Sequence, residues 1–136
     1  MDFYNLYAHG FARVAACTLP IAMVQPRKNA EAVLAQAREC ADAGACLAVF
    51  PELCLTGYSI EDLLMQDTVL DAVQDALAWL VPQTEDLGCI VVVGAPLVSL
   101  NRIYNCAVVI HRGTILGVVP KAYLPTYREF YERRQI

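Results

Sequence analysis

The feature that most constrains the fold of this chain is an alternation of short, uninterrupted apolar runs with longer segments of helical periodicity. Apolar runs occupy 46–50 and 90–94, and apolar residues recur at helical spacing across 30–41 and 69–80. A run of this length is typical of a central strand covered on both faces, whereas the periodic segments indicate amphipathic helices. Strands that alternate with helices predict an α/β fold.

The borders of the elements follow from residues that begin helices. The expected order is strand, helix, strand, helix and then three strands, with a buried first strand at 11–17. Pro26 and Asn29 predict the start of the first helix, with Asn29 as its N-cap. Ser59–Asp62 and Thr68–Asp71 have the pattern of capping boxes, which predicts two further helix starts.

The last two predicted strands, Ile103–Ile110 and Thr114–Val119, are separated only by His111-Arg112-Gly113. So short a connection predicts an antiparallel hairpin in which Gly113 supplies a positive φ. The segment 121–136 is aromatic and charged with little periodicity, and is predicted to be a long ordered loop.

Composition and charge exclude several classes of protein. The chain is 57% hydrophobic and 18% charged, which suits a dense core and excludes intrinsic disorder. Its formal net charge of −4 argues against a nucleic-acid partner. No apolar run approaches the roughly 20 residues that cross a bilayer, and Met1–Asn5 lacks the basic start of a signal peptide. We therefore expect a cytoplasmic protein that binds neither nucleic acid nor membrane.

The chain contains six cysteines, most of them within apolar runs: Cys17, Cys40, Cys46, Cys54, Cys89 and Cys106. They include no C-x-x-C pair, and the two histidines lie far apart in the sequence. This spacing argues against a zinc site, and the absence of any sign of secretion argues against a disulfide framework. We therefore expect no metal site and six buried, reduced thiols that pack as small hydrophobic groups.

Three charged residues stand at or near the ends of predicted strands. Glu52 follows the strand that ends at Phe50, and Lys121 follows the strand that ends at Val119. Glu129 lies eight residues after Lys121 and could orient it. A carboxylate and an ammonium at neighbouring strand ends suit acid–base work and oxyanion stabilisation. Taken singly, each also fits a plainer interpretation as a solvated strand end or a mixed-charge surface.

Two stretches of sequence resemble the catalytic motifs of the nitrilase, or carbon–nitrogen hydrolase, superfamily. Val49–Tyr58 (VFPELCLTGY) resembles the first motif, in which an apolar strand delivers a glutamate before a Thr-Gly-Tyr turn. Val119–Pro125 with Glu129 resembles the second motif, a lysine after a strand with a glutamate eight residues later. Three further segments look like the glutaminase domain of bacterial, especially actinobacterial, glutamine-dependent NAD⁺ synthetases: Tyr4–Thr18, Ser59–Asp67 and Thr126–Gln135. The resemblance therefore runs from end to end.

The resemblance implies a role for each motif residue. Glu52 would be the general base, Lys121 would stabilise the thiolate and the tetrahedral intermediate, and Glu129 would support them. Tyr127 would line the pocket for L-glutamine, with Tyr58 a weaker candidate. In the family, a cysteine attacks the side-chain amide, a thioester forms, and the released ammonia passes to a separate domain. That domain uses ATP and Mg²⁺ to amidate deamido-NAD⁺.

The sequence also departs from the family pattern. The family's nucleophilic cysteine follows the lysine motif, and none of the six cysteines occupies that position. We expect these residues to lack the synthetase domain, since they contain no glycine-rich phosphate loop, and we expect no cofactor in this chain. We expect residues 1–136 to be the truncated first half of an αββα sandwich, inactive alone and derived from a homo-oligomeric enzyme.

Two other functions remain open on the sequence alone. The chain could belong to another nitrilase-family amidase that acts on a small amide, or it could be a non-catalytic interaction fragment. Cys54 lies two residues after Glu52, but the turn that follows makes it a core residue in our interpretation rather than a substitute nucleophile. If the active-site interpretation is right, Glu52 and Lys121 should converge on one pocket.

Overall fold

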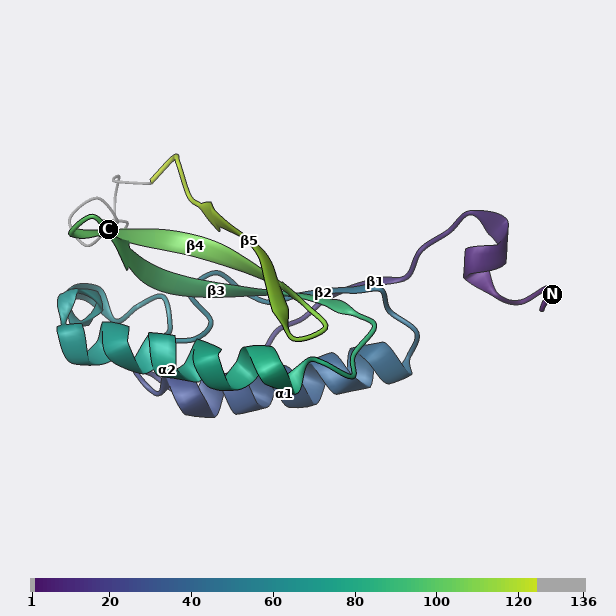
Figure 1. Ribbon diagram of the computed structural model, residues 1–136, viewed down its shortest axis with the longest axis horizontal. Coiled ribbons are helices and arrows are strands. Elements are labelled where there is room, and N and C mark those ends of the chain that lie inside the picture. The colour runs from purple at the N-terminus through teal and green to yellow at the C-terminus, as the bar shows by residue number, and fades with distance from the viewer. Residues whose placement is uncertain (1, 125–136) are drawn as a thin grey trace.

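The computed structural model describes residues 2–124, in which two long helices lie side by side against one face of a five-stranded sheet (Figure 1). Most of the loop predicted at 121–136 lies outside the described residues. The elements in chain order are η1 (Leu6–His9), β1 (Val14–Ala16), α1 (Pro26–Asp42), β2 (Leu47–Val49), η2 (Glu61–Met65), α2 (Asp67–Gln83), β3 (Ile90–Ser99), β4 (Arg102–His111) and β5 (Thr114–Pro120).

The sheet has the strand order β1-β2-β3-β4-β5. The pairs β1–β2 and β2–β3 are parallel, whereas β3–β4 and β4–β5 are antiparallel. Two successive reversals make β5 run parallel to β2, so both strands end at the same edge of the sheet. The predicted α/β fold is confirmed. The predicted hairpin between β4 and β5 is confirmed as well, with Gly113 at φ +79°.

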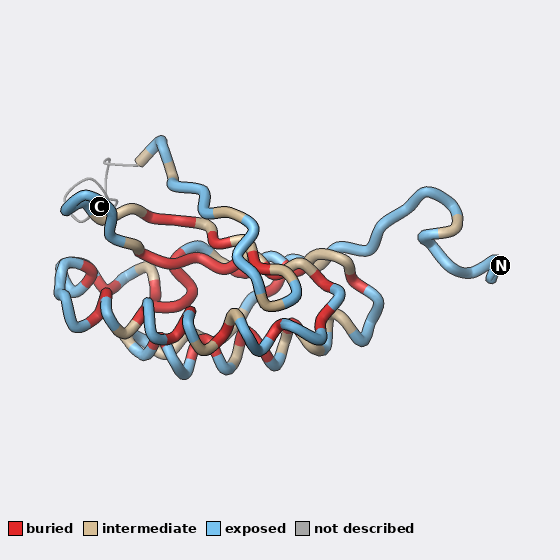
Figure 2. The backbone as a smooth tube through the Cα atoms, viewed as in Figure 1, coloured by how far each residue is buried: buried red, intermediate tan, exposed pale blue. Residues whose placement is uncertain are grey.

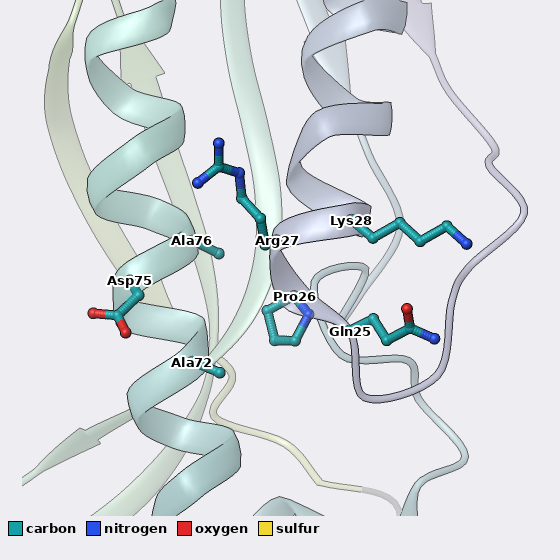
Figure 3. Close-up of a pocket in the computed structure, with 7 residues that line it drawn as sticks. All are labelled: Gln25, Pro26, Arg27, Lys28, Ala72, Asp75 and Ala76. Carbon is teal, nitrogen blue, oxygen red and sulfur yellow. The ribbon is translucent and has the colours of Figure 1, made fainter.

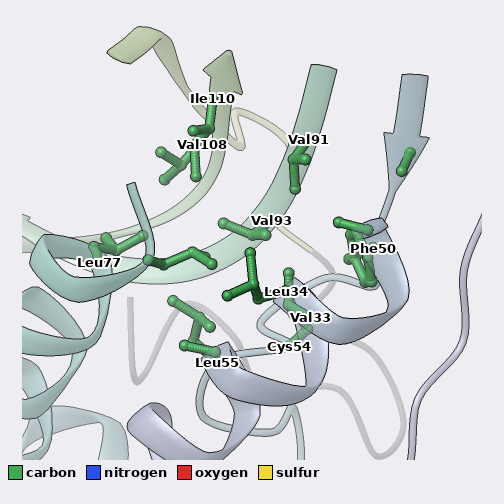
Figure 4. Close-up of a cluster of buried hydrophobic side chains, with 14 of the residues drawn as sticks. Val33, Leu34, Phe50, Cys54, Leu55, Leu77, Val91, Val93, Val108 and Ile110 are labelled. Carbon is green, nitrogen blue, oxygen red and sulfur yellow. The ribbon is translucent and has the colours of Figure 1, made fainter. Parts of the chain in front are cut away.

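The hydrophobic core lies between the sheet and the two helices (Figures 2 and 4). Residues that alternate along β3 and β4 supply the sheet side of the core, and Val91, Val93, Val108 and Ile110 are fully buried there. Val33 of α1 packs into the same cluster from the helix side. The apolar residues whose spacing predicted the helices and strands are therefore the residues that the fold buries.

The opposite face of the sheet is apolar and open. Val14, Val49 and Val119 lie on it and are 63%, 41% and 59% exposed. Within residues 2–124 no helix or strand covers this face. The prediction of a buried first strand is therefore wrong, since β1 is a short edge strand, and β2 is covered on one face rather than two. A sheet with one covered and one bare apolar face is half of the predicted sandwich.

The predicted helix caps are wrong. Helix α1 begins at Pro26, and the N-caps of α1, η2 and α2 are Gln25, Ile60 and Gln66, none of which makes a side-chain capping hydrogen bond. Asn29 lies inside the first turns of α1 and is only 2% exposed. Its amide nitrogen donates to the carbonyls of Ala22 and Leu55, and its oxygen accepts from the Ala22 N–H. At the start of α1, contacts with the loops around Ala22 and Leu55 take the place of side-chain capping.

The cysteines follow the prediction in part. All six are free thiols, and four of them are buried, whereas Cys40 and Cys46 are only partly covered.

Within residues 2–124, no helix combines the length and the hydropathy that crossing a bilayer requires.

Replacing Asn29 with alanine should destabilise the fold. The substitution leaves the buried carbonyl of Leu55 and the partly buried backbone of Ala22 without these hydrogen bonds, and a buried unsatisfied group costs about 1–3 kcal/mol. Lys28→Ala, on the exposed side of the same helical turn, is the control and should stay within about 0.5 kcal/mol. Chemical denaturation measures both. Equal stabilities of the two variants would contradict the assigned role of Asn29.

The isolated 136-residue chain should self-associate. Its open sheet face exposes a continuous apolar surface, and such surfaces larger than a few hundred Å² are rare on monomeric proteins. Sedimentation velocity should show concentration-dependent oligomers, and Val49→Lys together with Val119→Lys should reduce them. A monodisperse monomer of the unmodified chain would contradict this expectation.

Candidate active site

The loop after β2 carries Glu52 and is held in one conformation by hydrogen bonds along its length. The Cys54 N–H donates to the Pro51 carbonyl, and the Gly57 N–H donates to the Leu53 carbonyl. Leu53 adopts a left-handed conformation, φ +52°, while its side chain is 1% exposed. A non-glycine residue in this region costs about 1–2 kcal/mol and persists only where its surroundings over-determine it. The fold therefore maintains this turn against its local preference.

The loop that carries Glu52 packs directly against Gly94 of β3. A Cβ built on Gly94 would lie 2.6 Å from the Pro51 carbonyl oxygen and 2.9 Å from the Glu52 carbonyl carbon. It would also collide with the backbone nitrogen of Leu53. The Leu55 N–H, in turn, donates to the Gly94 carbonyl. Only glycine allows the backbone around Glu52 to approach the sheet this closely.

Lys121 follows β5 and meets Glu52 across two intervening strands. Its Nζ lies 2.7 Å from Oε1 of Glu52, with the two side chains 32% and 42% exposed. The meeting follows from topology, because β2 and β5 run in the same direction and end at the same edge. The prediction that Glu52 and Lys121 converge on one pocket is confirmed. Because both side chains are partly exposed to solvent, the ion pair contributes little to the stability of the fold. Its importance is therefore chemical rather than structural.

Asn105 is a third polar residue at this position, and the sequence analysis missed it. It lies on β4 and is 4% exposed. Its Nδ2 donates to Oε1 of Glu52 over 2.5 Å, and its main-chain carbonyl accepts from the Lys121 N–H over 2.7 Å. A signal was present, since Asn105 is an amide within a predicted strand of otherwise apolar and aromatic residues. Such a residue, when buried, needs a specific partner.

A cleft of about 350 Å³ opens beside these three polar groups. Apart from them, its walls are mostly apolar and come from the ends of β2, β3, β4 and β5: Val49, Phe50, Val92, Val93, Gly94, Cys106, Ala107, Val119 and Pro120. An apolar cleft with a few convergent polar groups is typical of a small-molecule site. A carboxylate beside an ammonium can move a proton and stabilise a developing negative charge.

The other predicted site residues lie elsewhere. Tyr58 is half-buried against the smaller core cluster that includes Leu53, and it is not among the described residues that line the cleft. Tyr127 and Glu129 lie outside the described residues. The functional roles of all three stay predictions.

Neither cysteine beside the Glu52 loop or the cleft is an activated thiol. Cys54 is 1% exposed within the core, and burial raises its pKa to about 11. Its neighbour is the backbone of Gly94, which both donates to and accepts from the sulfur. Burial also raises the pKa of Cys106, whose thiol donates to the Tyr104 carbonyl. The prediction that Cys54 is a core residue is confirmed.

A second cavity, between the start of α1 and the middle of α2, does not bring charged side chains together in a way that suits catalysis (Figure 3). Arg27 is paired with Glu31 and stacks on Trp79, while Lys28 and Asp75 point away from each other. Within residues 2–124, no group of three or more potential metal-binding side chains occurs. Among the described residues, the Glu52 cleft is therefore the candidate active site.

Replacing Gly94 with alanine should displace the Glu52 loop. The new methyl group would overlap the backbone of Pro51 and Leu53, and overpacking of this kind costs about 1–3 kcal/mol. Gly117→Ala on β5 is the matched control, because a Cβ there meets nothing within 4 Å. Thermal melting should show a lower transition for Gly94→Ala only. Equal melting of the two variants would show that the loop does not depend on this contact.

Comparison with known proteins agrees with this geometry. The carbon–nitrogen hydrolase family model matches residues 13–134. The chain is 65% identical over 136 residues to a glutamine-dependent NAD(+) synthetase of Mycobacterium tuberculosis, a match that covers 100% of this chain and 20% of that protein. The chain therefore spans about a fifth of the length of the curated relatives that it matches.

Two solved structures have the same arrangement of elements. The crystal structure of a glutamine-dependent NAD(+) synthetase from Cytophaga hutchinsonii matches with a TM-score of 0.84 at 24% identity, over 91% of this chain and 21% of that one. The enzyme of the same description from Acinetobacter baumannii, solved with ADP, matches with a TM-score of 0.77 at 30% identity, over 86% and 22%. Because the family model spans the segments that carry both Glu52 and Lys121, the chain belongs to the carbon–nitrogen hydrolase family.

Proposed function

We propose that this chain is part of the glutaminase region of a glutamine-dependent NAD⁺ synthetase and helps to hydrolyse the side-chain amide of L-glutamine. The observation that carries the proposal is the Glu52–Lys121 pair, 2.7 Å apart at the mouth of an apolar cleft. The 65% identity across the whole chain supports the choice of glutamine among possible amides. In this proposal the ammonia goes to a synthetase domain that uses ATP and Mg²⁺, within a homo-oligomeric, cytoplasmic enzyme.

In the proposed reaction, Glu52 acts as the general base and Lys121 stabilises negative charge. Glu52 takes the thiol proton of a cysteine that comes from outside residues 1–136, as the family resemblance implies. The sulfur attacks the amide carbon, and the amide oxygen gains negative charge near the Lys121 ammonium. Protonated Glu52 then gives its proton to the leaving nitrogen, so that ammonia departs and a thioester remains. A second cycle with water releases glutamate.

The surroundings of the pair suit these roles. The end of β5 places the ammonium next to Glu52, close to where negative charge develops on the substrate in this proposal. Tyr58, Tyr127 and Glu129 complete the proposed pocket, the first two toward glutamine and Glu129 toward Lys121. The chief alternative is an amidase for another small amide with the same charged pair. Substrate comparison separates the two.

Glu52→Gln and Lys121→Met should abolish glutamine use by the full-length gene product. General acid–base groups contribute about 10²- to 10⁴-fold, so ammonia release from glutamine should fall by at least that factor. NAD⁺ formation with ammonium chloride in place of glutamine should persist in both variants, because it bypasses this site. Coupled assays of ammonia and NAD⁺ measure the two activities.

The controls define what would contradict the proposal. Cys54→Ala should retain glutamine hydrolysis, since its thiol lies in the core, and residues 1–136 alone should release no ammonia. Turnover of a small aliphatic amide in preference to glutamine would favour the alternative amidase. Turnover by the isolated chain that disappears in Cys54→Ala would overturn the assignment of the nucleophile.

A further inference from the structure

We infer that Asn105 is a positioning residue that decides which oxygen of Glu52 acts as the base. This inference rests on the proposed function, in which Glu52 is the general base, and it goes further by assigning distinct roles to the two carboxylate oxygens. Oε1 is an anchored oxygen, and Oε2 is the oxygen that exchanges protons with the nucleophile and the leaving group.

The hydrogen bonds at Glu52 are unequally divided. Nδ2 of Asn105 and Nζ of Lys121 both meet Oε1, over 2.5 and 2.7 Å, and no donor among residues 2–124 reaches Oε2. Donors directed at a charged oxygen favour its ionised form and lower its tendency to accept a proton. Oε2 is therefore the oxygen to which the inference assigns the proton exchange, since both observed donors hold Oε1.

Asn105, rather than Lys121, determines this orientation. The ammonium sits on a flexible four-carbon stem and could follow the carboxylate through a rotation. Asn105 is 4% exposed on β4, so little water reaches its amide to replace the Glu52 oxygen. A buried amide that lost this bond would carry a desolvation cost, so the amide and Oε1 stay together.

The same residue also sets the position of the lysine. The Asn105 carbonyl accepts the Lys121 main-chain N–H over 2.7 Å, which extends the β4–β5 pairing one step beyond the Cys106–Pro120 pair. The side chain of Asn105 thus orients the base while its backbone fixes the residue that bears the positive charge. Substitution of the side chain alters the first function and spares the second, since the backbone bond needs no particular side chain.

The test is the comparison of kcat with KM for glutamine hydrolysis by Asn105→Leu and Asn105→Ser in the full-length gene product. Leucine keeps the volume without a donor, and serine keeps polarity with too short a reach, so at least one variant should fold. Both should lose about 10- to 100-fold in kcat and kcat/KM alike, with KM changed less than about twofold.

Controls separate positioning from general loosening of β4. Val109→Ala, on the same strand and the same sheet face, should leave kcat and KM unchanged. Asn105→Leu should add little to the loss already caused by Glu52→Gln, because it acts through that carboxylate. A variant with unchanged kcat, or with its loss confined to KM, overturns the inference while the proposed function stands. A wild-type protein inert toward glutamine overturns both.

Discussion

The close approach of the Glu52 loop to Gly94 is the contact on which the geometry of the site depends. A strand that simply ended at Val49 would release Glu52 into solvent. Here the backbone of Pro51 to Leu53 packs against β3 at Gly94, in the space that a side chain at position 94 would otherwise occupy. Asn29 holds the far end of the same loop through the Leu55 carbonyl. The carboxylate is thus carried by a rigid support rather than by a mobile loop.

The topology of the sheet turns this support into a site. Glu52 and Lys121 are 69 residues apart, yet each follows a strand that runs in the same direction. The hairpin β3–β4 reverses the chain once and the hairpin β4–β5 reverses it again, which returns the end of β5 to the edge where β2 ends. Asn105, at the intervening position on β4, joins the two charged groups. The site is therefore a consequence of strand direction as much as of residue type.

Much of this arrangement could be predicted from the sequence, and the errors have identifiable physical causes. Glu52 and Lys121 could be chosen because each is a charged residue that directly follows an apolar run. Asn105 could not be assigned, because its contact with Glu52 depends on how the loop after β2 packs against β3 and on the pairing of β3 with β4. Asn29 was misread as a cap, because asparagine is common at helix starts, whereas its actual partners are in the loop just before α1 and in the loop after β2.

The periodicity of apolar residues by itself determined the α/β class, the order of the elements, the β4–β5 hairpin and the two charged residues at strand ends. These features depend on local spacing and turn chemistry, which sequence records directly. Only the tertiary structure decided which face of each strand is buried, why Gly94 must lack a side chain, and how Asn105 and Lys121 meet one oxygen of Glu52. Those features arise from contacts between segments far apart in the chain, whose distances no local pattern encodes.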